Sequence, residues 1–317
     1  MTANEEADSR RRQMLATAFG QAIGHALQDA STIEIMVNPD GKLWVDQASR
    51  GRSFSGHVLD TADTERIIRI VAAHIRTEAH AGSPIVSAEL PESRERFEGL
   101  LPPIVAAPCF SIRKPAGLTF RLGDYVSNGI MTEDHARALR HAVINRENIL
   151  IAGGTSSGKT TLGNALLAEI ATMGERVIIL EDTRELRCEA EDCIALKTKP
   201  GVASLADLVR SSLRLRPDRI IIGEVRGGEA LDMLKAWNTG HPGGIATVHA
   251  NSAASALARL EQLIQGAVAT VPRALIAEAI DLVVYLQGRG DERRVTELIN
   301  LNSLEPSGGY RLKASCS

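Results

Sequence analysis

The stretch Asn148-Ile-Leu-Ile-Ala-Gly-Gly-Thr-Ser-Ser-Gly-Lys-Thr-Thr161 decides the fold of this chain. It matches the phosphate-loop pattern G-x-x-x-x-G-K-[ST], with Gly153, Gly158, Lys159 and Thr160 at the four fixed places. The apolar run before the loop is typical of a buried strand, and apolar residues recur at helical spacing after it. A strand, a glycine-rich loop and a helix in this order predict a site for a nucleoside triphosphate.

The residue types of this loop suit the binding of phosphate groups. Glycines let backbone N–H groups turn inward around phosphates, and the following helix presents its positive end to them. Lys159 reaches the terminal phosphates in such a loop, and the Thr160 hydroxyl ligates Mg²⁺. An ordinary glycine-rich turn is the alternative, which the strand and helix on either side disfavour. We expect nucleotide contacts from Gly153, Gly154, Thr155, Ser156, Ser157, Gly158, Lys159, Thr160 and Thr161.

Composition limits the class of protein. The 44% apolar and 24% charged content is ordinary for a globular chain, and the net charge of −3 argues against a dominant nucleic-acid surface. No apolar run approaches the ~20 residues that a membrane span needs, and residues 1–12 lack the apolar core of a signal peptide. We therefore expect a cytoplasmic protein that can dock at a membrane face. The four cysteines lack zinc-site spacing, so free thiols are expected.

The hydrophobic pattern predicts two domains. Residues 1–122 read as a small α+β domain, with helices at 14–28 and 60–78 and strands at 33–37, 42–45, 85–90 and 104–107. Residues 123–317 alternate helix and strand, which predicts an α/β domain with a mostly parallel sheet and helices on both faces. Phosphate chemistry then belongs at the carboxyl ends of the strands. We expect the tail after Ser303 to be weakly ordered.

Two apolar strands of the second domain end in carboxylates. The run at 220–224 resembles a Walker B strand, but Gly223 stands at the usual metal-shell aspartate position, which leaves Glu224 as the acid. Glu224 is expected to polarise the attacking water or to hold Mg²⁺ through water. The run at 178–182 ends in the same way at Glu181. Either one alone could be a solvated strand end, whereas both together indicate a hydrolytic site.

The stretch from Gly240 to Ser252 places two histidines around a short apolar run. A lone histidine is most often structural. His249, however, follows a predicted strand at its carboxyl end, where the γ-phosphate would lie. We expect it to sense that phosphate, or to couple its loss to movement of the next helix.

These segments resemble the ordered boxes of the secretion or traffic ATPases of type II and type IV secretion, pilus machinery and conjugation. The counterparts are a Walker A loop at 153–160, an Asp box at 181–185, a degenerate Walker B at 223–227 and a His box at 240–252. The similarity extends from about residue 112 to 284 and is closest to the conjugative-transfer branch. The four-cysteine module found near the C-terminus of type II members has no counterpart here.

The resemblance implies an ATP- and Mg²⁺-dependent hydrolase with a RecA-like domain at 123–317. It implies a homohexamer that works with membrane-associated components of a type IV secretion or conjugation system, at the inner membrane face. Glu224 would be the catalytic acid, supported by Glu181 and His249. Arg113 would contact the nucleotide from the N-terminal domain, and Arg226 would act near the γ-phosphate.

Three other functions fit the same residues. They are a RecA-like translocase that pulls DNA directly, a nucleotide-gated assembly scaffold with little turnover, and a pilus-retraction-type ATPase. The near-neutral charge and the aromatic content of only 3% argue against the translocase. We therefore expect no direct nucleic-acid binding.

Overall fold

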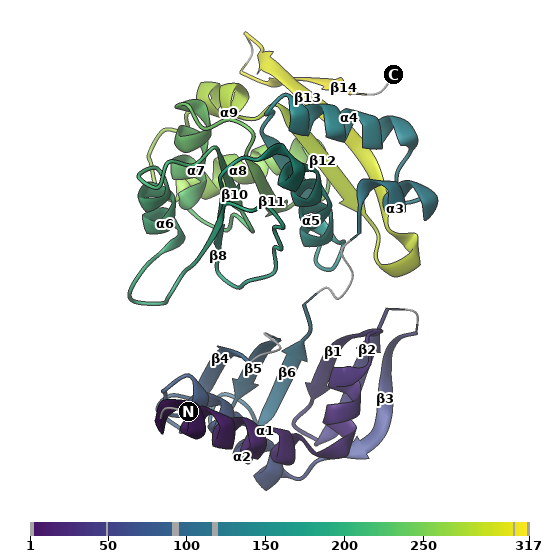
Figure 1. The fold of residues 1–317 in the computed structure, drawn as a ribbon, viewed down its shortest axis with the longest axis vertical. Helices are drawn as coiled ribbons and strands as arrows, with labels where there is room; N and C mark the ends of the chain where they lie inside the picture. Colours follow the sequence, from purple (N-terminus) through teal and green to yellow (C-terminus); the bar gives the residue numbers. More distant parts are fainter. Residues whose placement is uncertain (1–2, 49, 91–94, 116–119, 307, 316–317) are drawn as a thin grey trace. The chain divides into compact units, whose positions relative to one another are not determined.

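The computed structural model describes residues 3–48, 50–90, 95–115, 120–306 and 308–315. The chain forms two compact units, Met1–Gly117 and Leu118–Ser317. Each unit has its own sheet, so the chain is an α/β protein with two sheets (Figure 1).

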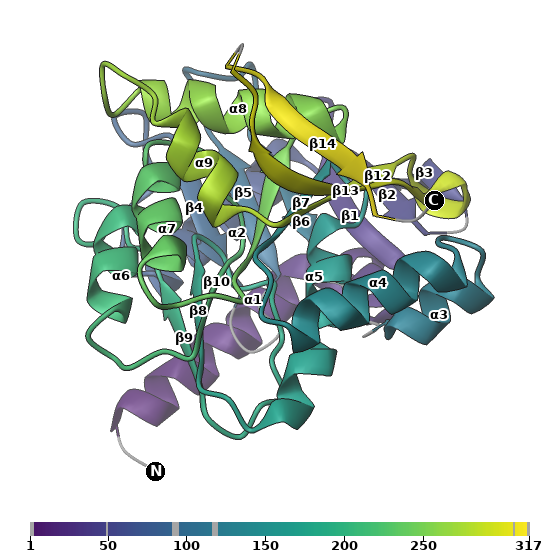
Figure 2. The ribbon, with the colours of Figure 1, turned by 90° about the horizontal axis from the view of Figure 1, so that it is seen from above.

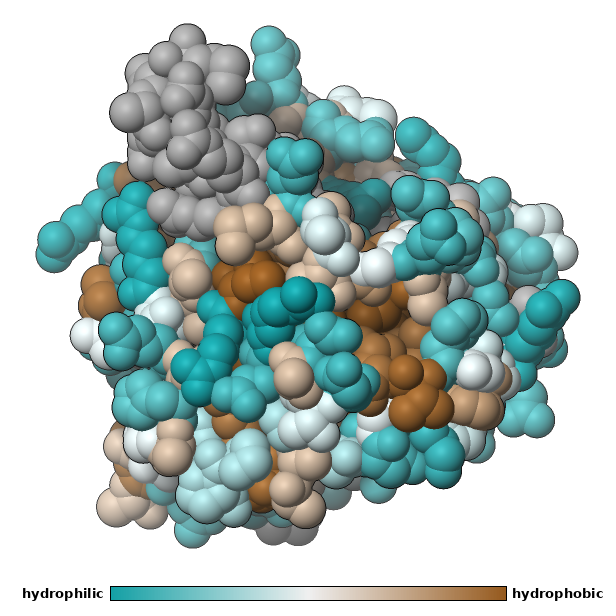
Figure 3. Space-filling view, turned by 90° about the horizontal axis from the view of Figure 1, so that it is seen from below, coloured by the Kyte–Doolittle hydropathy of each residue, from teal (hydrophilic) through white to brown (hydrophobic). Residues whose placement is uncertain are grey.

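The first unit is built on a six-stranded antiparallel sheet in the order β3-β2-β1-β6-β5-β4. Its strands are β1 (Thr32–Val37), β2 (Lys42–Gln47), β3 (Gly51–Val58), β4 (Ile85–Glu89), β5 (Arg96–Leu100) and β6 (Cys109–Arg113). Helices α1 (Ala3–Gln28) and α2 (Thr61–His74) share one apolar core with the sheet. Asp60 caps α2 by accepting from the N–H of Asp63 at 2.6 Å. Figure 3 shows apolar residues at the surface among hydrophilic ones, which is normal for a globular protein.

One predicted strand of the first unit is wrong, and two strands were not predicted. Residues 104–107 form no strand, because Pro102, Pro103 and Pro108 lack the N–H groups that a central strand donates, and β6 begins only at Cys109. The sequence analysis also missed β3 and β5. β3 is an exposed edge strand with little apolar alternation, so its sequence carries a weak signal.

The second unit contains an eight-stranded sheet in the order β14-β13-β12-β7-β11-β10-β8-β9. Neighbours from β12 to β9 are parallel, whereas β13 and β14 are antiparallel additions at one edge. The strands are β7 (Ile149–Gly153), β8 (Val177–Glu181), β9 (Cys193–Lys197), β10 (Arg219–Ile222), β11 (Ile245–His249), β12 (Leu282–Gln287), β13 (Arg294–Leu304) and β14 (Tyr310–Ala314). The expectation of a weakly ordered tail after Ser303 is wrong, because β14 pairs with β13 there.

Helices cover both faces of this sheet, as Figure 2 shows. Helices α6 (Leu205–Ser212), α7 (Glu229–Asn238), α8 (Ala253–Gln265) and α9 (Arg273–Ala279) pack into the core on one face. Helices α3 (Leu122–Ser127), α4 (Glu133–Ile144) and α5 (Lys159–Ile170) form the other face, and 3₁₀ turns follow α5 (η1, Ala171–Met173) and β12 (η2, Gly290–Glu292). The pattern Ser204-x-x-Asp207 in the sequence forms a capping box at the start of α6, since the Ser204 hydroxyl accepts from the N–H of Asp207.

Candidate nucleotide site

The phosphate loop joins β7 to α5 and needs glycine at two points. Residues 149–152 of β7 are fully buried, which fixes where the loop begins. A Cβ on Gly153 would lie 2.4 Å from Ser157 Oγ and 2.8 Å from the carbonyl oxygen of Leu286. Gly158 has a φ of 95°, a left-handed conformation that other residues rarely adopt. The loop therefore keeps a shape that only glycine allows at these positions.

The loop ends in a positive helix terminus beside a buried lysine. No acidic residue lies in the first turn of α5, so its N–H groups keep their attraction for anions. Lys159 is only 8% exposed, and its ammonium donates to the carbonyl oxygens of Gly153 at 3.1 Å and Gly154 at 2.9 Å. Thr155 and Ser156 are exposed, Ser157 is buried, and Thr160 and Thr161 are half-buried at the start of α5. All the predicted loop residues thus lie around one anion-attracting turn.

The neighbouring strands bring Glu224 and His249 to this lysine. Glu224 follows β10 and His249 ends β11, and the two strands are parallel neighbours. His249 Nε2 lies 2.6 Å from Glu224 Oε1, while His249 Nδ1 lies 3.5 Å from Lys159 Nζ. Burial lowers the pKa of the imidazole and the Lys159 ammonium lowers it further. A neutral imidazole can accept from Lys159 through Nδ1, while its Nε2 side lies against the Glu224 carboxylate.

Arg226 pairs with the same carboxylate. Its guanidinium donates to Glu224 Oε2, with Nε at 2.7 Å, and also lies 4.0 Å from Asp182 Oδ2. The turn that carries Arg226 is held by Glu229, which accepts from the N–H groups of Arg226 and Gly227. Glu224 is thus a carboxylate with a cation on one oxygen and an imidazole on the other.

Glu181 fills the space left by the glycine of the Walker B strand. The Glu181 side chain is 3% exposed, and its Oε1 accepts from the N–H groups of Glu185 at 2.9 Å and Leu186 at 2.8 Å. A Cβ on Gly223 would lie 2.9 Å from Glu181 Cγ. Burial raises the pKa of Glu181 to about 7, against the pull of the two hydrogen bonds. A carboxyl group from β8 therefore occupies the room that a side chain at 223 would need.

The oxygen atoms beside Thr160 suit a hard cation. Thr160 Oγ1 donates to Glu185 Oε2 at 3.2 Å, from the first turn of α5 to the loop after β8. Hydroxyl and carboxylate oxygens are ligands that Mg²⁺ prefers, and this ion keeps several waters of its own. The donor set at Thr160 and Glu185 thus fits Mg²⁺ bound together with phosphates.

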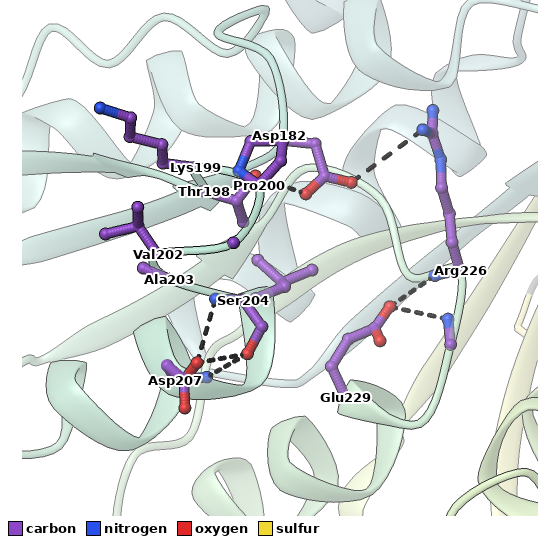
Figure 4. Close-up of a pocket in the computed structure, with 13 residues that line it drawn as sticks. Asp182, Thr198, Lys199, Pro200, Val202, Ala203, Ser204, Asp207, Arg226 and Glu229 are labelled. Atoms are coloured by element: carbon purple, nitrogen blue, oxygen red, sulfur yellow. Dashed lines mark hydrogen bonds and ion pairs between the residues drawn. The ribbon is translucent and has the colours of Figure 1, made fainter. Parts of the chain in front are cut away.

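A groove of about 640 Å³ lies beside Asp182 and Arg226 (Figure 4). It lies between the connection at 198–207 and the turn at 226–229, with Asp182 at its edge. Figure 4 shows the Arg226 guanidinium reaching toward Asp182. Arg226 therefore lines the groove and also contacts Glu224.

Comparison with known proteins assigns the family. The model of the family described as type II/IV secretion system protein matches residues 25–288. The chain belongs to this family. Conjugal transfer protein TrbB of Rhizobium radiobacter is 48% identical over 299 residues, which cover 94% of this chain and 90% of that protein. Type IV secretion system protein VirB11 of Bartonella quintana is 30% identical, covering 88% and 90%.

A solved structure shows the same fold. The Legionella pneumophila ATPase DotB superposes with a TM-score of 0.64 at 20% identity, covering 88% of this chain and 79% of that one. The predicted membership of the secretion ATPases is confirmed by the family match, and the resemblance to the conjugative-transfer branch by the identity with TrbB.

The structure brings most of the predicted site residues together. The loop, Glu224, His249 and Arg226 are joined by direct contacts, and Glu181 lies against Gly223 beside them. Arg113 is the last residue of β6 in the first unit, opposite Glu34 and Arg96 in the sheet. Its predicted contact with the nucleotide stays a prediction.

Sequence reasoning missed two residues beside the loop. Glu185 lay within the predicted Asp box, and its place next to Thr160 could have been suspected from that position. Arg293 approaches Gly158 from the connection between β12 and β13, so closely that a Cβ on Gly158 would lie 2.8 Å from its Cζ. No motif surrounds Arg293, so nothing in the sequence alone pointed to it.

Proposed function

We propose that the chain is a Mg²⁺-dependent ATPase that works as a homohexameric motor in a type IV secretion or conjugation system. The observation that carries this proposal is the connected set Lys159–His249–Glu224, which links the phosphate loop to the acid of the Walker B strand. The relatives support it, since TrbB is named a conjugal transfer protein and DotB an ATPase.

The loop and Lys159 bind the triphosphate. Backbone N–H groups of the loop and the positive end of α5 point at the phosphates. Lys159 now donates to two loop carbonyls and approaches His249, and it exchanges these neutral acceptors for charged phosphate oxygens when ATP binds. Charge-assisted hydrogen bonds are the stronger kind, so the exchange favours binding.

Thr160 and Glu185 would hold Mg²⁺ beside the loop, and the ion would supply positive charge against the negative charge of the phosphoryl group. Glu181 lies in the space beside Gly223, and we assign it to the waters around the metal. A nearby cation stabilises the ionised form of Glu181, which burial otherwise disfavours.

Glu224 polarises the attacking water. A carboxylate accepts a proton from such a water, and Glu224 is held in place for this role by Arg226 on one oxygen and by His249 beside the other. Because His249 also contacts Lys159, a phosphate that draws Lys159 away changes the hydrogen bonds of His249. His249 therefore reports the state of the phosphates to Glu224 and to the start of α8. Arg226 turns from Glu224 to the γ-phosphate side when the nucleotide is bound.

We propose the assembly from the resemblance to the family. A RecA-like domain at 123–317 forms a ring of six, and the N-terminal domain at 1–122 supplies Arg113 to the nucleotide. No helix in the described part of the chain is long and apolar enough to cross a membrane. We assign the ring to the cytoplasm, peripheral at the inner membrane face, where it contacts membrane-associated secretion components. Direct nucleic-acid binding plays no part in this function.

Two variants test the hydrolytic site. Lys159→Ala is expected to abolish hydrolysis with an unchanged circular dichroism spectrum, because the phosphates lose their cation. Glu224→Gln keeps the shape of the acid and is expected to bind ATP while hydrolysing it more slowly by about 10²-fold or more. Normal turnover in Lys159→Ala would show that the site lies elsewhere. Negligible turnover in the unmutated protein would favour a nucleotide-gated scaffold.

A further inference from the structure

The connection between β12 and β13 brings a second cation to the phosphate loop. β12 is the parallel neighbour of β7, with Leu286 opposite Gly153, so both strands end at the same level of the sheet. The chain turns back at once, because Gly288 has a φ of 78° and a Cβ there would lie 2.4 Å from the carbonyl oxygen of Glu292. Arg293 is the last residue of this turn before β13.

The side chain of Arg293 packs against the last glycine of the phosphate loop. A Cβ on Gly158 would lie 2.8 Å from Arg293 Cζ and Nε and 3.0 Å from Nη1. Gly158 directly precedes α5, so the guanidinium lies where the helix presents its positive end. Two positive groups are thus held side by side, an arrangement that an anion between them would stabilise.

Arg293 has donors that the protein leaves unused. Among the described residues its Nε is buried without a hydrogen-bond acceptor. The Ser157 side chain, which is only 2% exposed, also leaves its hydroxyl without a partner. Buried donors without an acceptor cost free energy, and phosphate oxygens satisfy such donors.

The order of the strands places Arg293 and the proposed hydrolytic residues on opposite sides of the phosphate loop. Glu224 follows β10 and His249 ends β11, on one side of β7, and the proposed function assigns both to the γ-phosphate end of the nucleotide. β12 lies on the other side of β7, so Arg293 approaches the loop from the side opposite the hydrolytic acid. The loop between them wraps the middle phosphates. Arg293 is therefore on the nucleoside side.

We propose that Arg293 is a ligand of the α- and β-phosphates, supplied by the same chain that supplies the phosphate loop. The proposal rests on the proposed function for the identity of the nucleotide. Arg293 serves binding and not hydrolysis, so it holds ADP as firmly as ATP. It would keep ADP in the site after phosphate release.

The test measures affinity for ADP and for inorganic pyrophosphate by calorimetry, on the full chain. Arg293→Ala is expected to weaken both ligands about tenfold to hundredfold, since hydrogen bonds to charged groups are the strong kind. Arg293→Lys keeps the positive charge but lacks the planar guanidinium. Its affinity for both ligands is expected to lie between that of the unmutated chain and that of Arg293→Ala. Arg289→Ala is the matched control, because Arg289 is an exposed arginine at the start of the same turn and should bind as the unmutated chain does.

A kinetic measurement separates this role from one in catalysis. For Arg293→Ala the KM for ATP should rise in step with the ADP dissociation constant, and kcat should stay the same. Unchanged affinity for ADP and pyrophosphate in a folded Arg293→Ala variant overturns the proposal. So does a fall in kcat with unchanged ADP affinity, which would place Arg293 at the γ-phosphate. If the unmutated chain binds ADP but does not hydrolyse ATP, the proposed function fails while the binding test still decides on Arg293.

Discussion

The variant Glu181→Gln tests the buried acid beside Gly223. Glutamine keeps the Oε1 atom that accepts from the N–H groups of Glu185 and Leu186, but it cannot ionise. Burial raises the pKa of Glu181 from its ordinary 4.5 to about 7 in the folded chain. Between about pH 4.5 and pH 7, Glu181 therefore keeps its proton in the folded state and has lost it in the unfolded state. The stability of the unmutated protein should fall as pH rises from about 4.5 through 7.

The size of the effect follows from this shift. Between pH 5 and pH 8 the two pKa values predict that the unmutated protein loses about 2–3 kcal/mol that Glu181→Gln keeps. For a unit of this size that corresponds to a relative gain of about 5–10 °C in the melting temperature of the variant. The assay is thermal unfolding of both proteins without nucleotide, at a series of pH values between 5 and 8.

Mg²⁺ and nucleotide should reduce this difference in stability between the two proteins. A cation bound near Glu181 stabilises its ionised form, so saturating Mg²⁺ and ADP should reduce the advantage of the variant at pH 8. A melting-temperature difference that stays constant from pH 5 to pH 8 without nucleotide would refute the account. It would mean that Glu181 ionises as a solvated carboxyl group does.

Two further variants test neighbouring parts of the account. Gly223→Ala places a Cβ 2.9 Å from Glu181 Cγ. We therefore expect the free energy of unfolding to fall by about 1–3 kcal/mol and ATP hydrolysis to become slower. An unchanged melting temperature would show that the Glu181 side chain moves aside freely. Arg113→Ala should slow steady-state ATP hydrolysis although Arg113 lies in the first unit, whereas an unchanged rate would remove that residue from the site.

The sequence predicted the parts of the fold whose causes are local. The phosphate loop is recognised from fixed glycines, and the start of α6 from the capping box at Ser204. The fully buried strands β7, β8 and β10 were recognised from short apolar runs. The strands that were missed are stabilised by their neighbours instead. β9 has partly exposed polar positions, and β14 exists because β13 offers it an edge.

In the site, too, some residues are recognisable from the local sequence and others only from the pairing of strands. Glu224 and His249 were recognisable because each follows an apolar strand, and parallel strands bring their carboxyl ends to one edge. Their direct contact depends on β10 and β11 being neighbours, which no local pattern reveals. The position of Arg293 beside the phosphate loop depends on the antiparallel return of the chain after β12 and on the tight turn at Gly288. The place of Glu181 beside Gly223 likewise needed the pairing of β8 with β10.

The mass of the protein in solution with and without Mg²⁺ and ATP tests the motor most directly. The Glu224→Gln variant is the suitable sample, because slow hydrolysis keeps ATP in the site. The account predicts a ring of six chains of 34.0 kDa each when ATP is bound. A single chain of 34.0 kDa under saturating ATP and Mg²⁺ would contradict it.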